Sequence, residues 1–435
     1  MLRFGDAEND GDGFNIVVEI LKMKKLSLLV TLYLFAFSVY AQSWDSLDTG
    51  IDGGLNYGRV FSLSVYNSEL YVAGSFSYAG GNPVQSIASW NGSNWFALGA
   101  PSITAIRTTT VYNNKLYVGD PLVGAYGVST WDGSNWQTSG SLPQAAVALG
   151  VYNNSIYASV FVNANDDYIY KLEDGSWDLV NAGIDNAVNA FAVYNNELYA
   201  GGNFLTAGGD SVRRIARWND ASWSAAGEGL NQVVWCLTIH NGELYAGGNF
   251  SSRVSKWDGT TWTDIGFGFD SDVRALCSFN GVLYAGGNFT TAGGIPANHI
   301  AQWDGTSWSA LGDGVDSTVF ALCVYNSAIY AGGLFSYAGG IPANRIAKWN
   351  PLGIGILESV NENEVDVFPN PATTQLTISG YTPAYLKLCN TLGQTVAEAS
   401  NTTTLLLGTL PQGLYVLQLF DAKGGLVRAE KVVKE

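Results

Sequence analysis

The chain has 435 residues, enough for more than one domain, and its 47% hydrophobic content is typical of a globular protein. A formal net charge of −16 argues against a nucleic-acid partner, because phosphates call for basic patches. The 52 glycines and the 13% aromatic content favour an all-β chain that is dense in turns.

The first 41 residues predict an exported protein. Residues 1–22 precede a second methionine and are expected to be an over-extended start. Residues 23–41 read as a signal peptide, with two lysines, an apolar run at Leu26–Phe37 and a small-residue cleavage site ending at Ala41. The apolar run is too short for a dependable membrane span.

A unit of four short strands is clearest at Phe269–Gly314. Two predicted strands, Val273–Phe279 and Val282–Gly287, are separated by an Asn-Gly hairpin turn. A polar loop leads to Ile300–Trp303, and an Asp-Gly turn separates that strand from Ser307–Leu311. A lone sheet of this kind exposes both apolar faces, so it needs neighbours.

The unit recurs along the chain. A Leu/Ile-Tyr dipeptide returns every 39 to 46 residues, at Tyr71, Tyr117, Tyr157, Tyr199, Tyr245, Tyr284 and Tyr330. This period with four strands per repeat is typical of a β-propeller. The seventh repeat stops after Ile346–Asn350, and Ser43–Gly50 supplies the missing strand. The prediction is an all-β, seven-bladed propeller over residues 43–350, closed by an N-terminal strand.

Aromatic and sulfur residues in the repeats are predicted to pack in the core. The Trp residues of the Trp-Asp-Gly-x-x-Trp hairpins are expected between blades rather than against a sugar. Cys236, Cys277 and Cys323 read as small buried residues, and the four cysteines do not look like a disulfide framework. With only His240 and His299 to serve as bases, we expect no metal centre and no cofactor.

Long loops between the second and third strands are the first candidate site. In repeats six, seven and one these loops carry Ala-Gly-Gly and should form one rim on the face of the blade connections. The candidate ligand-binding residues on this rim are Tyr78, Tyr337, Thr291, Asn298, Asn344 and Arg345. Tyrosine offers a flat apolar surface and a hydroxyl, which suits a sugar or a peptide. The alternative is that both tyrosines pack onto the neighbouring blade.

Repeated carboxylates in the blade connections are the second candidate. They follow a Gly-x-Asp pattern at Asp52, Asp185, Asp270 and Asp316. An Asp in such a turn can bond nearby backbone N–H groups and fix the loop. The functional interpretation is a ring of carboxylates around the channel mouth, able to hold a cation through oxygen ligands.

A second domain follows a linker at residues 351–364. Alternating strands and turns over residues 365–435 predict a small Ig-like β-sandwich. This region resembles the type A C-terminal sorting domain of the Bacteroidota type IX secretion system. The matching residues are Phe368-Pro369-Asn370-Pro371, Leu392-Gly393-Gln394, Gly413 and Tyr415 within Leu410–Tyr415, and Lys431-Val432-Val433-Lys434. The resemblance implies export to the periplasm, passage through the outer-membrane translocon, and removal of the domain by a sortase-like protease.

Residues 43–350 are similar to secreted propellers of the kelch/galactose-oxidase type in the Gly-Gly ending of strand two and the later Trp. The copper centre of that fold needs paired His ligands and a Tyr–Cys pair, which two scattered histidines cannot supply. We expect a monomeric extracellular or cell-surface binding or adhesion protein, with a glycan or protein ligand. The alternative is a secreted carbohydrate-active hydrolase or lyase that uses the carboxylates of the propeller face.

Overall fold

The computed structural model describes residues 43–54, 58–99, 105–122, 125–163, 166–180, 183–265, 267–350, 366–380, 382–390, 395–408, 410–420 and 426–434. Four predictions concern residues outside these ranges: the over-extended start at 1–22, the signal peptide at 23–41, the linker at 351–364 and the motif Leu392-Gly393-Gln394.

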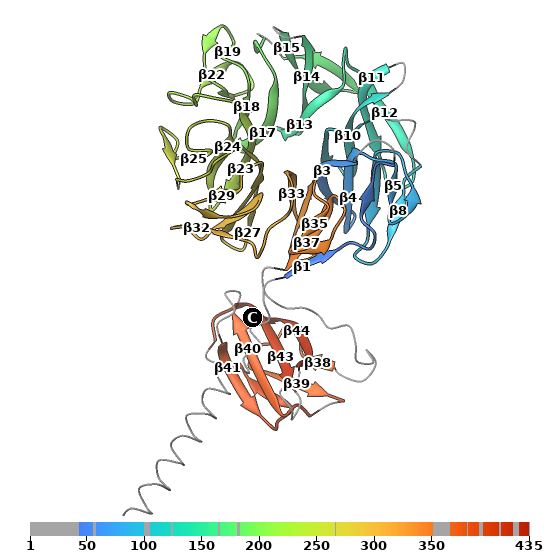
Figure 1. Cartoon of the computed structure of the whole chain (residues 1–435), viewed down its shortest axis with the longest axis vertical. Helices are drawn as coiled ribbons and strands as arrows, with labels where there is room; N and C mark the ends of the chain where they lie inside the picture. Colours follow the sequence, from blue (N-terminus) through green and yellow to red (C-terminus); the bar gives the residue numbers. More distant parts are fainter. Residues whose placement is uncertain are drawn as a thin grey trace, which may run out of the picture. The chain divides into compact units, whose positions relative to one another are not determined.

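Seven four-stranded antiparallel sheets make up the described part of residues 43–350. They follow one another around a ring in chain order (Figure 1), and we number these blades one to seven. From the inner to the outer strand the blades are β3 (Arg59–Tyr66), β4 (Glu69–Ser75), β7 (Ile87–Trp90), β8 (Trp95–Ala97); β9 (Thr108–Tyr112), β10 (Lys115–Leu122), β11 (Ala125–Trp131), β12 (Trp136–Ser141); β13 (Ala146–Tyr152), β14 (Ser155–Asn163), β15 (Asp166–Glu173), β16 (Ser176–Leu179); β17 (Val188–Tyr194), β18 (Glu197–Gly202), β21 (Ile215–Trp218), β22 (Trp223–Ala225); β23 (Val234–His240), β24 (Glu243–Gly248), β25 (Val254–Trp257), β26 (Trp262–Asp264); β27 (Val273–Phe279), β28 (Val282–Gly287), β31 (Ile300–Trp303), β32 (Trp308–Ala310); and β33 (Val319–Tyr325), β34 (Ala328–Gly333), β37 (Ile346–Asn350), β1 (Ser43–Ser46).

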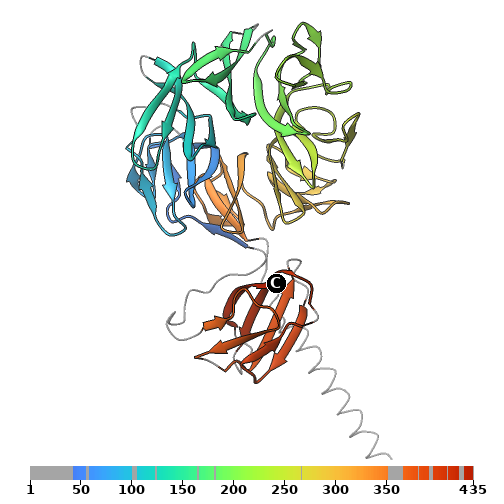
Figure 2. The same ribbon diagram turned by 180° about the vertical axis from the view of Figure 1, so that it is seen from behind.

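The ring is closed by the N-terminal strand, as the sequence predicts. Strand β1 pairs antiparallel with β37, from Ser43 opposite Asn350 to Ser46 opposite Ala347. Each inner strand contacts the inner strand of the next blade, and β33 of blade seven contacts β3 of blade one. The view from behind shows the same first and last sheets side by side (Figure 2). The Tyr325 hydroxyl also donates a 3.0 Å hydrogen bond to the Ser68 carbonyl across this junction.

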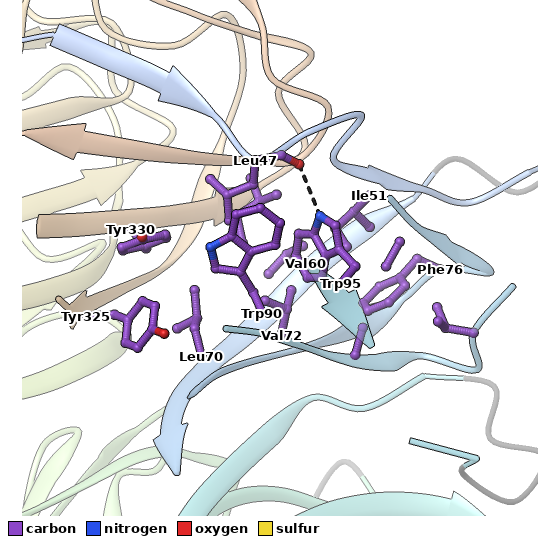
Figure 3. Close-up of a cluster of buried hydrophobic side chains, with 14 of the residues drawn as sticks. Leu47, Ile51, Val60, Leu70, Val72, Phe76, Trp90, Trp95, Tyr325 and Tyr330 are labelled. Carbon is purple, nitrogen blue, oxygen red and sulfur yellow. Dashed lines mark hydrogen bonds between the residues drawn. The ribbon is translucent and has the colours of Figure 1, made fainter. Parts of the chain in front are cut away.

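A buried cluster joins three segments at the point of closure (Figure 3). Leu47 and Ile51 come from the N-terminal segment, Trp95 from blade one and Tyr330 from blade seven. The Trp95 indole Nε1 donates a 3.1 Å hydrogen bond to the Leu47 carbonyl, which fixes the segment that follows β1. The N-terminal strand is therefore held by apolar packing as well as by its ladder.

Tryptophans bridge the other blades in the same way, which confirms their predicted packing role. The outer Trp of a blade lies beside the inner Trp of its own blade, with ring centroids 5.2 Å apart for Trp257 and Trp262. Its indole Nε1 donates to a carbonyl of the preceding blade, as from Trp262 to Ala226 at 3.0 Å. The same bond forms from Trp44, Trp136, Trp177 and Trp308.

The Gly-Gly pair at the end of the second strand lets two backbones approach. In blade six, a Cβ on Gly287 would lie 2.2 Å from the carbonyl oxygen of Asp272, the residue that precedes the inner strand β27. A Cβ on Gly286 would lie 2.5 Å from Val319 Cγ1 of blade seven. Real Cβ atoms do not come so close, so only glycine fits at either position.

The long loops lie against the blade connections, as predicted. Each forms a two-residue ribbon, and in blade one the connection β2 (Ile51–Asp52) pairs with it. Isolated bridges place Ile184 beside Ala207 and Val315 beside Ala338 in the same way. The ribbons are β5 (Tyr78–Ala79) with β6 (Asn82–Pro83), β19 (Thr206–Ala207) with β20 (Asp210–Ser211), β29 (Thr291–Ala292) with β30 (Ile295–Pro296), and β35 (Tyr337–Ala338) with β36 (Ile341–Pro342).

Residues 366–434, in their described part, form two antiparallel sheets around a separate core. That core contains Leu376, Leu386, Leu417 and Leu419, and it includes no propeller residue. One sheet has the order β38 (Asp366–Phe368), β39 (Gln375–Ser379), β42 (Thr404–Leu406). The other has the order β41 (Thr395–Ser400), β40 (Tyr385–Asn390), β43 (Gly413–Phe420), β44 (Leu426–Lys434). The predicted β-sandwich is confirmed.

Candidate ligand-binding site

The inner strands carry a repeated β-bulge near their first residues. In blade six, Val273 pairs with Gly287 and Ala275 with Gly286, so Arg274 has no partner in the ladder. The register shifts in the same place at Phe61, Val147, Asn189, Trp235 and Phe320. A bulge re-aims the side chain of the extra residue. These side chains are therefore free to face the middle of the ring.

The bulge residues line one cavity of about 530 Å³, which we call the channel-mouth cavity. Its size falls within the range of small-molecule sites, roughly 300–1,000 Å³. The cavity lies at the end of the ring where the inner strands begin, next to the blade connections. All seven blades contribute, because the remaining lining residues are Arg107, Gln144, Ala145 and Ala187.

Aromatic rings make up much of the wall. The rings of Phe61 and Phe320 pack across the junction of blades one and seven, with centroids 5.6 Å apart. The guanidinium carbon of Arg274 lies 4.0 Å from the centroid of the Trp235 ring, a cation–π arrangement. The Arg274 Nε also donates to the carboxylate of the buried Asp272. Arg274 is thus held in one orientation from two sides.

Arg107 differs from Arg274, because its backbone is fixed while its side chain has no partner among the described residues. Ile106, fully buried beside it, donates its backbone N–H to the Gly74 carbonyl at 2.8 Å and fixes the chain at the start of β9. The Arg107 side chain is exposed and makes no hydrogen bond or ion pair with any residue that the structure describes. Asn189 donates from Nδ2 to the Val234 carbonyl at 2.9 Å, which leaves its Oδ1 as an acceptor.

The predicted carboxylates hold loops instead of lining this cavity. Asp185, Asp270 and Asp316 each accept two backbone N–H bonds from the long loop of their own blade, as from Thr290 and Thr291 to Asp270. Asp52 accepts the Gly54 N–H at 2.9 Å. Burial alone would raise the pKa of Asp270, but the Thr290 hydroxyl and the backbone amides outweigh it and lower that pKa. The structural interpretation is confirmed for these residues.

No metal site accompanies them in the part of the chain that the structure describes. Within those residues, no group of three or more His, Cys, Asp or Glu side chains is arranged to hold a metal ion. The three propeller cysteines are free thiols. Burial raises the pKa of Cys236 and of Cys277 to about 12, and that of Cys323 to about 11. Thiols in this state suit the packing role predicted for them.

The predicted rim is continuous over blades six, seven and one. The Asn298 and Asn344 backbone carbonyls accept from Val315 and Ile51, the first residues of the next blade's connection. Their side chains donate to Asp313 and Thr49 carbonyls at 3.0 and 2.9 Å. Thr291 donates to the Gly268 carbonyl, and Arg345 to the Gly58 and Phe335 carbonyls. These four candidate side chains therefore tie the rim together.

The two tyrosines of the rim are exposed, as are Asn298 and Asn344, but unlike the asparagines they lie at the first position of a loop ribbon. The side chains of Tyr78 and Tyr337 are 39% and 49% exposed. Both occupy the first position of a loop ribbon, β5 and β35, on the side of the ring where the channel-mouth cavity opens. This exposure leaves part of each tyrosine available to a ligand, and more than half of each remains covered. Their role in ligand binding stays a prediction.

The sequence prediction missed the bulge residues, although the repeats contain a signal for them. The inner strands read Val-Phe-Ser-Leu at 60–63, Val-Trp-Cys-Leu at 234–237, Val-Arg-Ala-Leu at 273–276 and Val-Phe-Ala-Leu at 319–322. The first and last positions repeat and are core, while the second changes from blade to blade. A position that varies inside a repeating core strand indicates a side chain that lies outside the shared core of the blade.

The sorting motif is assembled by two ends of the C-terminal domain. The Asn370 side chain, between Pro369 and Pro371, donates to the Lys431 carbonyl at 2.5 Å and accepts from the Val433 N–H at 2.9 Å. Strand β43 pairs Gly413 with Lys434 and the buried Tyr415 with Val432. The Tyr415 hydroxyl donates to the Pro411 carbonyl at 2.8 Å. The first and last motif segments are thus joined directly.

Comparison with known proteins identifies this domain. Residues 366–435 match the family model described as a secretion system C-terminal sorting domain. The match indicates type IX secretion, and it places the protein at the cell surface or in the extracellular space. No curated protein matches the chain at a significant level. Within the described residues, no helix has the length and apolarity that a membrane crossing requires.

Solved structures resemble the chain in fold. Two crystal structures of the extracellular domain of BT4673 from B. thetaiotaomicron align with TM-scores of 0.50, at 12% and 13% identity. They cover 90% and 79% of this chain but only 48% and 45% of their own chains, so this protein spans about half their length. The WD40 β-propeller domain of Doa1 aligns with a TM-score of 0.48 and 12% identity, covering 71% of this chain and 96% of its own. At 12% and 13% identity, the likeness to the two BT4673 structures shows the fold alone.

Proposed function

We propose that the propeller is a non-catalytic binding or adhesion module of a protein exported by type IX secretion, and that its ligand enters the channel-mouth cavity. The observation that carries this proposal is the convergence of the bulge residues. Six inner strands share the same bulge, and the residues that they place in the cavity range over Phe, Val, Asn, Trp and Arg, while Arg107 enters it from just before the inner strand of blade two. Loop and strand-end positions on a rigid scaffold can vary without disturbing the core, which is where binding usually resides.

Export provides the setting. A signal peptide at 23–41 would take the chain to the periplasm, and the translocon would recognise the sorting domain. Removal of that domain by the sortase-like protease would leave a monomeric propeller of the kelch/galactose-oxidase type on the surface or released. Tyr78 and Tyr337 on the rim would extend contacts for a glycan or protein ligand beyond the cavity.

A secreted hydrolase or lyase is the alternative, and the geometry favours it less. Such an enzyme needs carboxylates with unequal environments at the substrate. Asp185, Asp270 and Asp316 share one environment and each is bonded to its own loop.

The test is a glycan and peptide array probed with the chain from Gln42 to Glu435. Trp235→Ala removes the largest ring of the cavity, and the double variant Tyr78→Ala/Tyr337→Ala removes the exposed rim. We expect Trp235→Ala to lose binding at least tenfold while the rim variant keeps most of it, with the melting temperature of both followed by circular dichroism. Release of reducing ends from an array glycan by the wild type would instead support the enzyme.

A further inference from the structure

The channel-mouth cavity has a charge opposite to that of the propeller. Residues 43–350 contain 24 Asp and Glu against 12 Lys and Arg. The charged side chains that line the cavity are nevertheless both cations, Arg107 of blade two and Arg274 of blade six. Arg274 is paired with the buried Asp272, so among the described residues that line the cavity Arg107 carries the uncompensated positive charge, which an anionic ligand would neutralise.

The two arginines have donors to spare. Arg274 uses Nε for Asp272, which leaves its two terminal nitrogens, and its stacking on Trp235 fixes the plane of the group. Arg107 has all five N–H groups unused by the described residues. A planar guanidinium of this kind matches a carboxylate through two parallel hydrogen bonds.

The uncharged residues of the cavity wall indicate what the uncharged part of the ligand contains. Phe61, Phe320 and Trp235 give flat apolar surfaces, against which the C–H face of a sugar ring can pack. The amides of Gln144 and Asn189 add hydrogen-bonding groups that suit hydroxyls, with Oδ1 of Asn189 unused by its bond to Val234. A purely apolar acid would leave these amides without partners, at a cost in affinity.

We propose that the channel-mouth cavity binds an acidic saccharide, whose carboxylate lies between Arg107 and Arg274 and whose ring packs on the aromatic wall. The inference rests on the proposed binding function and adds the chemical class of the ligand. Arg107 supplies a positive charge that has no partner among the described residues. Arg274 supplies a guanidinium group whose orientation is fixed by Asp272 and Trp235. The ligand is held by electrostatics at one end and by apolar contact at the other.

The probe is an array of glucuronic, galacturonic and mannuronic acid oligomers, each beside its methyl ester, which removes the charge and keeps the ring. The protein is the chain from Gln42 to Glu435. We expect at least one acid to bind and its ester to bind at least tenfold more weakly. Raising the salt concentration should weaken the acid and leave any residual ester binding unchanged.

Arg107→Gln is the decisive variant, because Arg107 has no hydrogen-bond or ion-pair partner among the described residues whose structure would suffer. Losing a charge-assisted hydrogen bond should weaken acid binding by about tenfold to a hundredfold, without changing ester binding or the melting temperature. Arg213→Gln is the matched control: it removes one exposed positive charge from the long loop of blade four, 3.9 Å from Glu228, and should change nothing. Arg274→Gln is avoided, since it strands the buried Asp272 carboxylate.

Two results would overturn the inference. Equal binding of acid and ester, with Arg107→Gln unchanged and Trp235→Ala weakened, would mean that the cavity binds a neutral ligand, and the proposed binding function would stand. Absence of binding to every acid would also overturn the saccharide assignment. The proposed function itself falls only if the wider glycan and peptide array finds no ligand that depends on the cavity.

Discussion

Trp44→Ala should destabilise the whole propeller, although Trp44 lies in a four-residue strand at one end of the described chain. The Trp44 side chain is 6% exposed, its ring centroid lies 5.2 Å from that of Trp349, and its Nε1 donates to the Leu311 carbonyl at 3.0 Å. Truncation of a buried Trp to Ala costs about 3–5 kcal/mol. That is a large share of the roughly 5–15 kcal/mol by which folded domains are stable.

Urea unfolding followed by tryptophan fluorescence and by circular dichroism measures this cost. Trp308→Ala in blade six is the matched control, because Trp308 is 4% exposed and donates to the Ile265 carbonyl at 3.2 Å in the equivalent place. The two variants should lose similar free energies of unfolding. If Trp44→Ala costs less than about 1 kcal/mol while Trp308→Ala costs the full amount, β1 is an appendage and the ring does not depend on it.

Four further outcomes follow from the structure. Removal of residues 366–435 should leave the melting temperature of the propeller unchanged, since the two cores share no residue, and should abolish surface export in the native host; normal surface levels would contradict the sorting role. Cys277, whose thiol pKa burial raises to about 12, should react with iodoacetamide at pH 8 only after urea unfolds the protein. Backbone and hydroxyl hydrogen bonds lower the pKa of Asp304 to about 2, so the stability that its carboxylate contributes is complete above about pH 4 and is lost as the pH falls toward 2. Asp304→Asn should therefore make the melting temperature depend less on pH in that range, and an unchanged dependence would contradict this. Tyr78→Ala/Tyr337→Ala should cost less than about 1 kcal/mol in urea unfolding because Tyr78 and Tyr337 are 39% and 49% exposed and lie outside the buried clusters, and a larger loss would place them in the core.

The fold could be predicted because its determinants are local and repeated. Asn-Gly and Asp-Gly turns fix the hairpins, and the predicted strands Val273–Phe279, Val282–Gly287 and Ile300–Trp303 match β27, β28 and β31 to the residue. The closing strand was recognisable because the seventh repeat lacks the piece that Ser43–Gly50 contains. The fourth strand is shorter than predicted, Trp308–Ala310 in place of Ser307–Leu311, because Ser307 bonds Asp304 in the turn.

The sequence prediction placed its candidate residues on the side of the ring where the channel-mouth cavity lies, but it did not single out the residues that line this cavity. The sequence prediction selected the recurring Asp residues, but a residue that recurs in four of the seven blades is more often one that stabilises its own blade, as the bonds of Asp270 and Asp316 show. Trp235 and Arg274 were not predicted, because a bulge is set by backbone register between strands, and Arg107 lies just before the inner strand of blade two, outside any bulge. That register depends on the close approach of Gly287 to Asp272, which no single strand reveals.

The closing strand also dictates the order in which the molecule assembles. Ser43 pairs with Asn350, whereas a typical hairpin joins residues about ten positions apart. Five doublings of loop length separate the two cases, which adds about 3 kcal/mol of chain entropy to closure. We therefore expect blade seven to form three strands first, with the edge of β37 unpaired until β1 pairs with it. During that interval β1 of a second molecule competes for the same edge, so refolding at high concentration should yield strand-exchanged oligomers and refolding at low concentration closed monomers.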